Sequence, residues 1–409
     1  MSDRPREQIP LQPWMQDPAT RAVISALEAE GQAVRFVGGC VRDALLNRPV
    51  RDVDIATPDP PETVMALLER GGLKVVPTGL SHGTVTAISG GSPYEVTTLR
   101  TDVETFGRRA RVAFTSNWQE DAARRDFTMN ALSCSPDGWI WDYFGGLEDA
   151  RAGRIRFVGN PRARIAEDYL RLLRFFRFLA HYGRAAPDAA ALEAAAEAAP
   201  KLAQLSGERI REELLRLLAA EDPVPTLRLM QNHRILDEVL PEIGEPSHLQ
   251  RLLTLHPEAD PLLRLGALLT CDAVGAARVA ERLRLSNADR DRLITFTRRP
   301  QEARPGINPR HLRILTYRHG KSRIADWLYL AASEAAAKPE QLSEDLKRLA
   351  QESVPRFPLK GRDLLPLGAS RGPALGELLQ ELEEWWIAQD FAPDRDVLLQ
   401  EARRRLRKT

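Results

Sequence analysis

The chain has little cysteine, almost no net charge and no long apolar run. Its three cysteines, Cys40, Cys134 and Cys271, are far apart in the sequence, so they form neither a zinc-binding spacing nor a disulfide framework. No apolar run is long enough to span a membrane, and residues 1–6 lack the apolar core of a signal peptide. We therefore expect a protein of the reducing cytoplasm without membrane contact, in which Cys40 and Cys134 pack as small apolar side chains.

The near-zero net charge gives no global argument for nucleic-acid binding, because the 58 Lys and Arg residues are balanced in number by 57 Asp and Glu residues. The distribution is more informative. Residues 151–184 contain nine arginines but only Glu167 and Asp168 as acids, and residues 401–409 hold five basic residues and one Glu. Local basic patches of this kind suit a polyanion that is held at chosen places. The alternative for the final patch is a solvated helix face.

The 409 residues predict an α+β protein, with a small mixed-sheet head followed by a long, mostly helical neck, body and tail. Apolar segments that read as strands lie at residues 34–37, 74–76, 84–88 and 94–100. After residue 160, Ala, Leu, Glu and Arg dominate in helical patterns without a strict repeat, which argues against a solenoid. We predict four segments: a loosely packed arm and helix (1–29), a catalytic head (30–150), a helical neck with a base-selecting helix (151–260), and a helical body and tail (261–409).

A strand, a glycine pair and a helix follow one another at residues 34–46. The strand ends at Gly38 and Gly39, and a helical spacing then runs to a break at residues 47–49. This order turns backbone N–H groups and the positive end of a helix dipole toward a phosphate. Arg42, one turn into the helix, can add a fixed charge on the same side. A glycine pair alone is usually a turn.

Two acids, Asp52 and Asp54, lie on the next predicted strand. Side chains two residues apart on a strand point the same way, and two adjacent carboxylates attract a divalent cation. A phosphate-binding turn followed by such a pair indicates a nucleoside triphosphate with Mg²⁺. Glu95, on a later strand, is a candidate third acid or proton acceptor if it faces the buried side, and otherwise an exposed strand glutamate.

Two further segments carry charge in patterns that suggest binding. Arg124, Arg125 and Asp126 can hold a triphosphate or a ribose hydroxyl, with the acid fixing a guanidinium, or they form an ordinary surface ion pair. Between the strands and these arginines, residues 100–118 read as a mobile polar loop. At residues 79–83 we expect His82 to order a turn rather than to act as a nucleophile.

The most informative helical segment is residues 165–178, where polar residues recur every three positions. These are Asp168, Arg171, Arg174 and Arg177. On a helix they would form one polar stripe, opposite Leu and Phe. Such a stripe is usually a solvated face, but here the apolar residues on both flanks favour a groove. A carboxylate can accept from the amino group of cytosine or adenine while a guanidinium donates to ring acceptors, whereas guanine and uracil present an acceptor at that place.

Taken in order, four motifs resemble those of the class II nucleotidyltransferases, that is, the tRNA CCA-adding enzymes and bacterial poly(A) polymerases. They are Gly-Gly-x-Val-Arg-Asp (38–43), Asp-x-Asp (52–54), Arg-Arg-Asp (124–126) and Glu-Asp-x-x-Arg (167–171). The resemblance covers residues 34–214, because residues 206–214 are similar to the family's neck motif, here interpreted as support for the base-selecting helix. It extends weakly to residues 357–376.

The resemblance implies a nucleotidyltransferase head that adds C, C and A to the 3′ end of tRNA from CTP and ATP, without a template and with release of pyrophosphate. Asp52 and Asp54 would bind two Mg²⁺ ions, with Glu95 beside them as a further catalytic acid. The nucleotide would be held by Gly38, Gly39, Arg42 and Arg125, and its base by Asp168, Arg171, Arg174 and Arg177. The implied partner is the 3′ end and acceptor region of tRNA, contacted also by the tail; no protein partner is evident.

Several alternatives stay open. A poly(A) polymerase is the nearest, although residues 78–83 lack the basic Gly-Arg-Arg-Phe type of stretch that such relatives carry. An enzyme that adds only CC or only A is also possible. A non-catalytic RNA-binding relative should have lost Asp52 or Asp54, and both are present. A transferase that modifies a small hydroxylated molecule would not need the long basic helical region.

Overall fold

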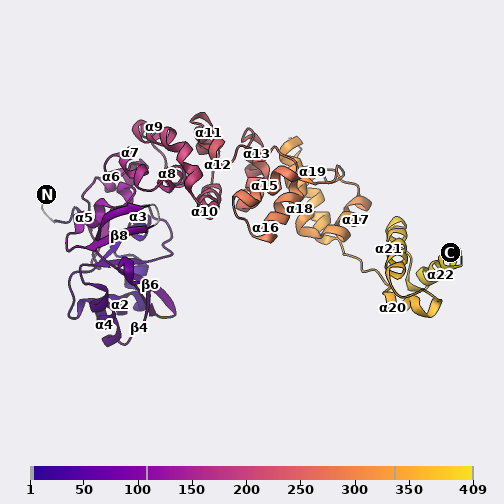
Figure 1. Ribbon diagram of the computed structural model, residues 1–409, viewed down its shortest axis with the longest axis horizontal. Helices are drawn as coiled ribbons and strands as arrows, with labels where there is room; N and C mark the ends of the chain where they lie inside the picture. The colour runs from indigo at the N-terminus through magenta and orange to yellow at the C-terminus, as the bar shows by residue number, and fades with distance from the viewer. Residues whose placement is uncertain (1–3, 107–108, 336–337, 408–409) are drawn as a thin grey trace. The chain divides into compact units, whose positions relative to one another are not determined.

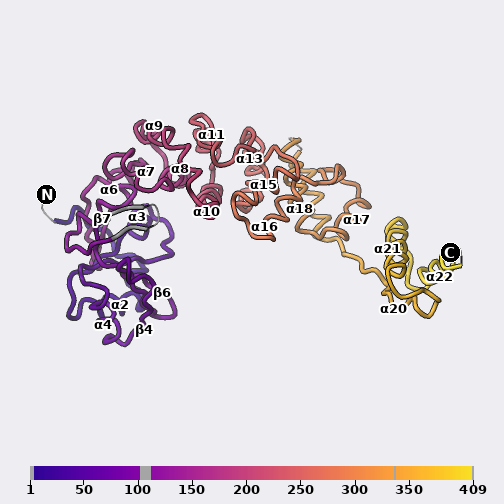
Figure 2. The backbone as a smooth tube through the Cα atoms, viewed as in Figure 1, coloured from indigo at the N-terminus to yellow at the C-terminus, as the bar shows by residue number. Residues whose placement is uncertain are grey.

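The structure of the chain is a computed structural model that describes residues 4–106, 109–335 and 338–407. The chain forms two compact units, Met1–Pro241 and Glu242–Thr409. The strands lie in the first unit, and the chain is helical from α6 (Gly146–Ala152) onward (Figures 1 and 2). The predicted fold class, a mixed sheet followed by a mostly helical body, is confirmed. The four predicted segments divide the chain more finely than these two units and stay a prediction.

The first unit is built on an eight-stranded sheet in the order β1-β10-β9-β2-β3-β6-β5-β4. Its strands are β1 (Glu7–Gln8), β2 (Arg35–Val37), β3 (Asp54–Thr57), β4 (Lys74–Gly79), β5 (Thr84–Ser89), β6 (Ser92–Thr98), β9 (Ser133–Cys134) and β10 (Trp139–Trp141). Among the described strands, β3 and β6 form the one parallel pair, in which Asp54 is the partner of Glu95. This register places the first residue of β3 beside an acid in the middle of β6.

Helices cover one face of the sheet, and the other face carries Asp54. Asp17 begins α2 (Pro18–Glu28) by accepting a hydrogen bond from the N–H of Ala19 at 2.8 Å. Helix α2 and α4 (Pro61–Arg70) pack on each other and on β5, in a core that includes Phe36, Ile55 and Val96. Residues whose side chains point to the other face, such as Val37, Ala56 and Leu99, pack instead with Trp118. The alternation of the strands therefore separates the helix-covered face from the face that carries Asp54.

Two segments predicted as loose are ordered, and both predictions were wrong. In the N-terminal arm, β1 pairs with β10, and α1 (Pro13–Gln16) buries Met15 in the main core. The predicted loop at residues 100–118 contains an antiparallel hairpin of β7 (Arg100–Phe106) and β8 (Arg109–Phe114). Its residues Gly107 and Arg108 lie outside the described residues. Paired backbone groups stabilise both segments despite their polar or proline-rich composition.

The remainder of the first unit is helical. It contains α3 (Gly39–Leu45), η1 (Leu80–His82), α5 (Trp118–Ala123), η2 (Thr128–Asn130), α6, α7 (Pro161–Glu167), α8 (Leu170–Tyr182), α9 (Ala189–Ala198), η3 (Ala199–Gln204), α10 (Gly207–Leu218), α11 (Val224–Asn232) and α12 (Ile235–Val239). Helix α8 buries one apolar face, with Phe175 and Phe176 fully enclosed. As predicted, α10 packs along α8.

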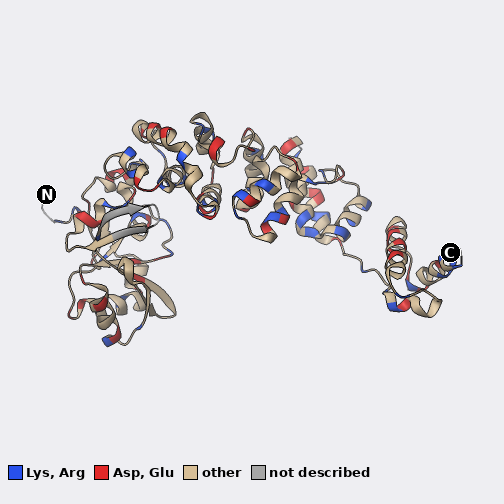
Figure 3. Ribbon diagram, in the orientation of Figure 1, with Lys and Arg blue, Asp and Glu red and all other residues tan. Residues whose placement is uncertain are grey.

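The second unit consists of helices. These are α13 (Ser247–Leu255), α14 (Pro261–Leu268), α15 (Ala273–Arg282), α16 (Asn287–Thr297), α17 (Pro309–His319), α18 (Lys321–Ala335), α19 (Pro339–Gln351), α20 (Gly361–Leu364), η4 (Leu365–Leu367), α21 (Pro373–Ala388) and α22 (Arg395–Leu406). Trp386 is buried in the core of the last helices. Figure 3 shows Lys and Arg interspersed with Asp and Glu along this unit. In α22, Arg404 and Arg405 pair with Glu401, so part of the predicted basic patch is neutralised.

Two expectations from composition can be compared with the structure directly. Cys40 and Cys134 are free and buried, and burial raises the pKa of each thiol to about 12, so both are apolar packing groups as predicted. Within the described part of the chain, no helix combines the length and apolarity that a membrane crossing requires.

Candidate active site

A cavity of about 520 Å³ in the first unit collects most of the predicted site residues. The predicted residues that line it are Gly38, Gly39, Arg42, Asp54, Arg125, Asp168, Arg171, Arg174 and Arg177. The structure adds Asp126, Asn130, Leu170, Phe178 and Arg209. Asp52 and Glu95 are not among the lining residues. Segments that are more than a hundred residues apart in the sequence therefore face one space.

The glycine turn is required by backbone conformation and by a close contact. Gly38 has φ 73° and ψ −125° and immediately precedes α3. A Cβ atom on Gly38 would lie 3.0 Å from Nη1 of Arg125. Any other residue would be strained here and would press on this guanidinium. Gly38 and Arg125 therefore form one unit, although 87 positions separate them.

Arg42 is buried and fully engaged. Its Nε and Nη2 donate to Asp43 at 2.9 and 2.7 Å, and its Nη1 donates to Oδ1 of Asn130 at 2.7 Å. Its guanidinium also lies 4.4 Å from the ring centre of Tyr182 in α8. Arg42 thus connects α3 to η2 and α8. Its predicted contact with a triphosphate stays a prediction.

The three predicted acids are arranged differently from what the sequence suggested. Strand β3 begins at Asp54, so Asp52 precedes the strand and is exposed. Glu95 is also exposed, so of the two interpretations the one with an acid on the buried side does not hold. It lies opposite Asp54, and its catalytic role stays a prediction. Burial and then the negative charge of Glu95 raise the pKa of Asp54. Among the described residues, no three His, Cys, Asp or Glu side chains form a ready-made metal cluster.

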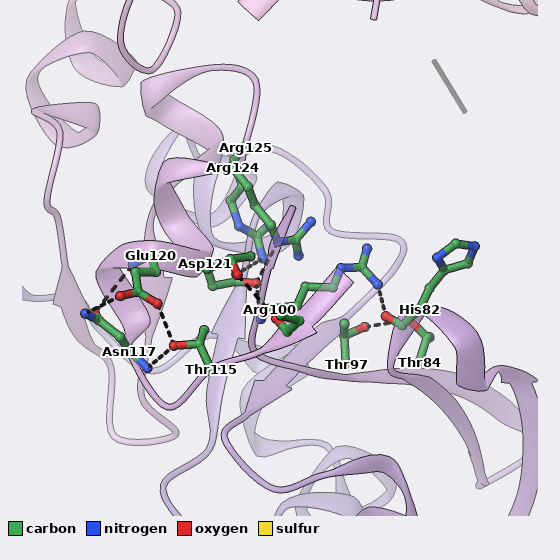
Figure 4. A network of polar contacts seen from close by, with 12 residues as sticks. His82, Thr84, Thr97, Arg100, Thr115, Asn117, Glu120, Asp121, Arg124 and Arg125 are labelled. Carbon is green, nitrogen blue, oxygen red and sulfur yellow. Dashed lines mark hydrogen bonds and ion pairs between the residues drawn. The ribbon is translucent and has the colours of Figure 1, made fainter. Parts of the chain in front are cut away.

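Sequence reasoning missed a buried acid, Asp121 in α5, beside the predicted Arg124–Arg125 pair. It accepts from Nε of Arg124 at 2.8 Å, from Nη2 of Arg125 at 3.1 Å and from the N–H of Arg100 at 3.3 Å (Figure 4). Burial opposes its ionisation, but the charges of Arg125 and Arg124 outweigh burial and lower the pKa of Asp121. A single acid outside any motif gave no signal in the sequence.

Asp126, the acid of the Arg-Arg-Asp motif, is buried and connects the segment that follows α5 to α8. Its Oδ1 accepts from the N–H of Phe127 and from Nδ2 of Asn130, both at 2.9 Å. Its Oδ2 accepts from Nε of Arg174 in α8 at 2.7 Å. Burial opposes ionisation here too, but the charge of Arg174 prevails and the pKa of Asp126 is lowered. The surface ion-pair interpretation of this motif is therefore excluded.

The polar stripe on α8 begins at Arg171 and not, as predicted, at Asp168. Asp168 lies in extended backbone between α7 and α8, with φ −155° and ψ 109°, so it does not share a helix with the arginines. Its Oδ1 accepts from the N–H of Leu170 at 3.1 Å, and its Oδ2 accepts from Nη2 of Arg209 in α10 at 2.6 Å. The break still directs Asp168 to the cavity that Arg171 lines.

The arginines of α8 are held by acids rather than by solvent. Arg171 pairs with Glu167, and its Nη1 donates to the carbonyl of Arg164 at 3.1 Å. Arg177 donates through Nε to Glu213 of α10 at 2.6 Å. Arg209 and Glu213 of α10 thus orient residues that line the cavity. The sequence pointed to this helix as support but not to these two side chains.

Comparisons with known proteins show the family to which this chain is related. The pattern of the poly(A) polymerase head domain matches residues 34–156, and that of the probable RNA and SrmB-binding site of polymerase A matches residues 186–245. The mitochondrial CCA tRNA nucleotidyltransferase 1 of Danio rerio is 35% identical over 383 residues, which cover 90% of this chain and 86% of that protein. The CCA-adding enzyme of Limosilactobacillus reuteri (strain DSM 20016) is 32% identical over 398 residues, covering 95% and 96%.

A solved structure supports the same relationship. The crystal structure of the Bacillus stearothermophilus CCA-adding enzyme in complex with CTP aligns with a TM-score of 0.76 and 28% identity. The alignment covers 97% of this chain and 98% of that one. By its motifs, fold and relatives, the chain belongs to the family of tRNA CCA-adding enzymes and poly(A) polymerases.

Proposed function

We propose that this protein adds C, C and A to the 3′ end of tRNA, using CTP twice and ATP once and releasing one pyrophosphate at each step. One observation carries the proposal: Asp54, the glycine turn with Arg125, and the pair Asp168 and Arg171 all line one cavity. Transfer and base selection can therefore act on the same nucleotide. The relatives named above as CCA-adding enzymes support the choice of this reaction.

In this proposal the base is chosen by side chains instead of by a template strand. Cytosine and adenine both present an amino donor where guanine and uracil present an acceptor. Each carboxylate oxygen of Asp168 already has one donor, from Leu170 or Arg209, and retains acceptor capacity for that amino group. Arg171 would donate to the ring acceptors. A base with an acceptor facing Asp168 would place two acceptors against each other, and the base acceptor would stay unpaired, which is costly in a partly buried site.

Asp52 and Asp54 would hold Mg²⁺. Carboxylate oxygens are the donors that this ion prefers, and burial, followed by the negative charge of Glu95, raises the pKa of Asp54, so a bound cation would favour its ionised form. Mg²⁺ commonly takes one or two carboxylates and fills its other positions with phosphates and water, which suits a pair rather than a closed cluster. When bound, two such ions would activate the primer's 3′ hydroxyl and stabilise the leaving pyrophosphate.

The protein's own residues would position the nucleotide. Gly38 and Gly39 let the phosphates approach the backbone at the start of α3, and Arg125 above the turn would contact phosphate or ribose. Arg174 and Arg177 would line the base pocket, held by Asp126 and Glu213. The tRNA contacts of the tail and the cytoplasmic setting also remain proposals; the three free cysteines are compatible with the latter.

The test uses tRNA that lacks its last three nucleotides, with CTP alone, ATP alone or both. We expect two cytidines with CTP alone and completion by one adenosine when ATP is added. Long adenosine tracts from ATP alone would indicate a poly(A) polymerase instead. Asp52→Ala should abolish transfer while circular dichroism shows an intact fold; retained transfer would place the metal site elsewhere.

A further inference from the structure

We propose that Asp121 is a positioning residue for the nucleotide, which acts by holding Arg125 against the glycine turn. The proposal rests on the proposed function, because it concerns how Arg125 is presented to the triphosphate or ribose. Asp121 lies outside the four motifs and does not line the cavity among the described residues. Its role must therefore pass through another side chain.

The side chain of Asp121 is 5% exposed, and each of its oxygens is used. Oδ2 accepts from Nη2 of Arg125 at 3.1 Å. Oδ1 accepts from Nε of Arg124 at 2.8 Å and from the N–H of Arg100 at 3.3 Å. Figure 4 shows Asp121 between the two arginines and Arg100, the first residue of β7. One carboxylate thus fixes the arginine pair relative to the first residue of the β7–β8 hairpin.

Arg125 is confined from the opposite side as well. Its Nη1 lies 3.0 Å from the point where a Cβ of Gly38 would be. Its carbonyl accepts from Nη2 of Arg164 in α7 at 2.7 Å. The backbone of Arg125 is therefore held by α7 and one edge of its guanidinium by α5, while the other edge lies close to the glycine turn. A side chain that is fixed before the ligand arrives loses less conformational freedom on binding, so the ligand binds more tightly.

Helix α5 has the geometry to deliver this carboxylate. Asn117 begins the helix by accepting from the N–H of Gln119 at 2.9 Å and that of Glu120 at 3.4 Å. The helix ends at Ala123, so Arg124 and Arg125 leave it three and four residues after Asp121. At this spacing side chains of one helical turn meet. Asp121 consequently lies within reach of both arginines.

The competing interpretation is that Asp121 only stabilises the junction of α5 and β7. A matched control exists in the same unit. Asp149 in α6 has a side chain that is 0% exposed and accepts from Arg154 and Arg156, both at 2.9 Å. Neither arginine is among the described residues that line the cavity. Replacing either aspartate removes a buried acid with two arginine partners, but only Asp121 holds an arginine of the cavity.

The experiment measures CTP binding to the full-length chain with Mg²⁺ by titration calorimetry, without tRNA. We expect Asp121→Asn to raise the Kd for CTP about tenfold, the size of one charge-assisted hydrogen bond. Asp149→Asn should change it less than about twofold while lowering the melting temperature to a similar extent. In an Arg125→Ala background, Asp121→Asn should have no further effect on the Kd. Equal effects of the two aspartate variants, or an undiminished effect without Arg125, would overturn the proposal.

If Asp121→Asn does not fold, Asp121→Glu provides the test, because it keeps the charge but displaces the carboxylate by one methylene. We expect about a threefold rise in Kd at a nearly unchanged melting temperature. An unchanged Kd would overturn the proposal. The proposed function fails separately: a wild-type protein that binds CTP but does not extend tRNA would refute CCA addition and leave the role of Asp121 intact.

Discussion

Arg174 of α8 donates through Nε to Oδ2 of Asp126 at 2.7 Å, which connects the residues that follow α5 to the helix of the base pocket. Asp126 is buried, and it also binds Asn130, which accepts from Arg42. The pair is therefore part of a continuous polar path from α3 to α8. Arg174 extends the path to Glu213 of α10 at 3.7 Å. The two sides of the cavity are fixed to each other through this path.

Loss of this acid should loosen α8. Asp126→Asn leaves Arg174 without its main counter-charge, and we expect a cost of about 2–3 kcal/mol in local stability, discounted because the arginine is partly exposed. Hydrogen exchange measured by mass spectrometry should show faster exchange in peptides of α8. Peptides from α18 in the second unit serve as the internal reference. Unchanged exchange in α8 would contradict the structural role of the pair.

The same acid predicts a pH dependence. Because the pKa of Asp126 is lower in the folded protein, its contribution to stability is fully present above its unfolded pKa of about 3.9. That contribution is lost as pH falls through the lower folded value. We expect the protection of α8 to fall steeply below about pH 4 in the wild type and less steeply in Asp126→Asn. A loss of this contribution as pH falls from 7 to 5 would contradict the lowered pKa, because it would lie above the pH range in which Asp126 takes up its proton.

Asp54 should show the opposite effect on stability. Burial and the charge of Glu95 raise its pKa, so the ionised carboxylate costs stability at neutral pH. We expect Asp54→Asn to raise the melting temperature by about 1–3 °C in metal-free buffer while abolishing transfer. Differential scanning calorimetry with a chelator checks the first part. A lower melting temperature would show that Asp54 is a structural acid instead.

Gly38 can be tested against another glycine with positive φ. Gly38→Ala should weaken CTP binding about tenfold, because the added Cβ strains the backbone and also contacts the guanidinium of Arg125. Gly72 has φ 75° and nothing within 4 Å of an added Cβ. Gly72→Ala therefore places a Cβ at a positive φ without the contact, and we expect CTP binding to change less than about twofold. Equal effects on binding would mean that strain alone explains Gly38.

Base selection can be tested at Asp168. Asp168→Asn places an amide donor where the carboxylate accepted, so the site gains a partner for the uracil carbonyl. We expect the ratio of kcat/KM for CTP over UTP to fall about 100-fold. Asp188→Asn is the control, because Asp188 also accepts from the N–H two residues on, at 2.9 Å, but begins α9 outside the lining of the cavity. An unchanged ratio in Asp168→Asn would remove Asp168 from base selection.

The sequence alone predicts those features of the structure that local residue patterns determine. The Gly-Gly turn, the strand before it and the apolar face of α8 follow from backbone preferences and periodicity, and all are present. Asp168 shows the limit, since no Pro or Gly marks the break between α7 and α8. The break depends on partners, Leu170 and Arg209, of which the latter is 41 residues away.

Pairing between distant segments explains the other differences. The hairpin at residues 100–114 and the paired N-terminal arm gain stability from strands that local composition does not reveal. Asp121 is one acid in a short helix, and only the folded chain brings it to Arg125 and Arg100. Exposure of Glu95 was equally hidden, because alternation along a strand does not say which face is covered.

In the proposed reaction, this one cavity both transfers a nucleotide and chooses its base without a template. The most direct measurement sequences the products formed on tRNA without its last three nucleotides when all four nucleoside triphosphates compete with Mg²⁺ present. The account predicts that extended molecules end in CCA and then stop. Products with G or U at the first three positions, or chains that continue as adenosine tracts, would contradict it.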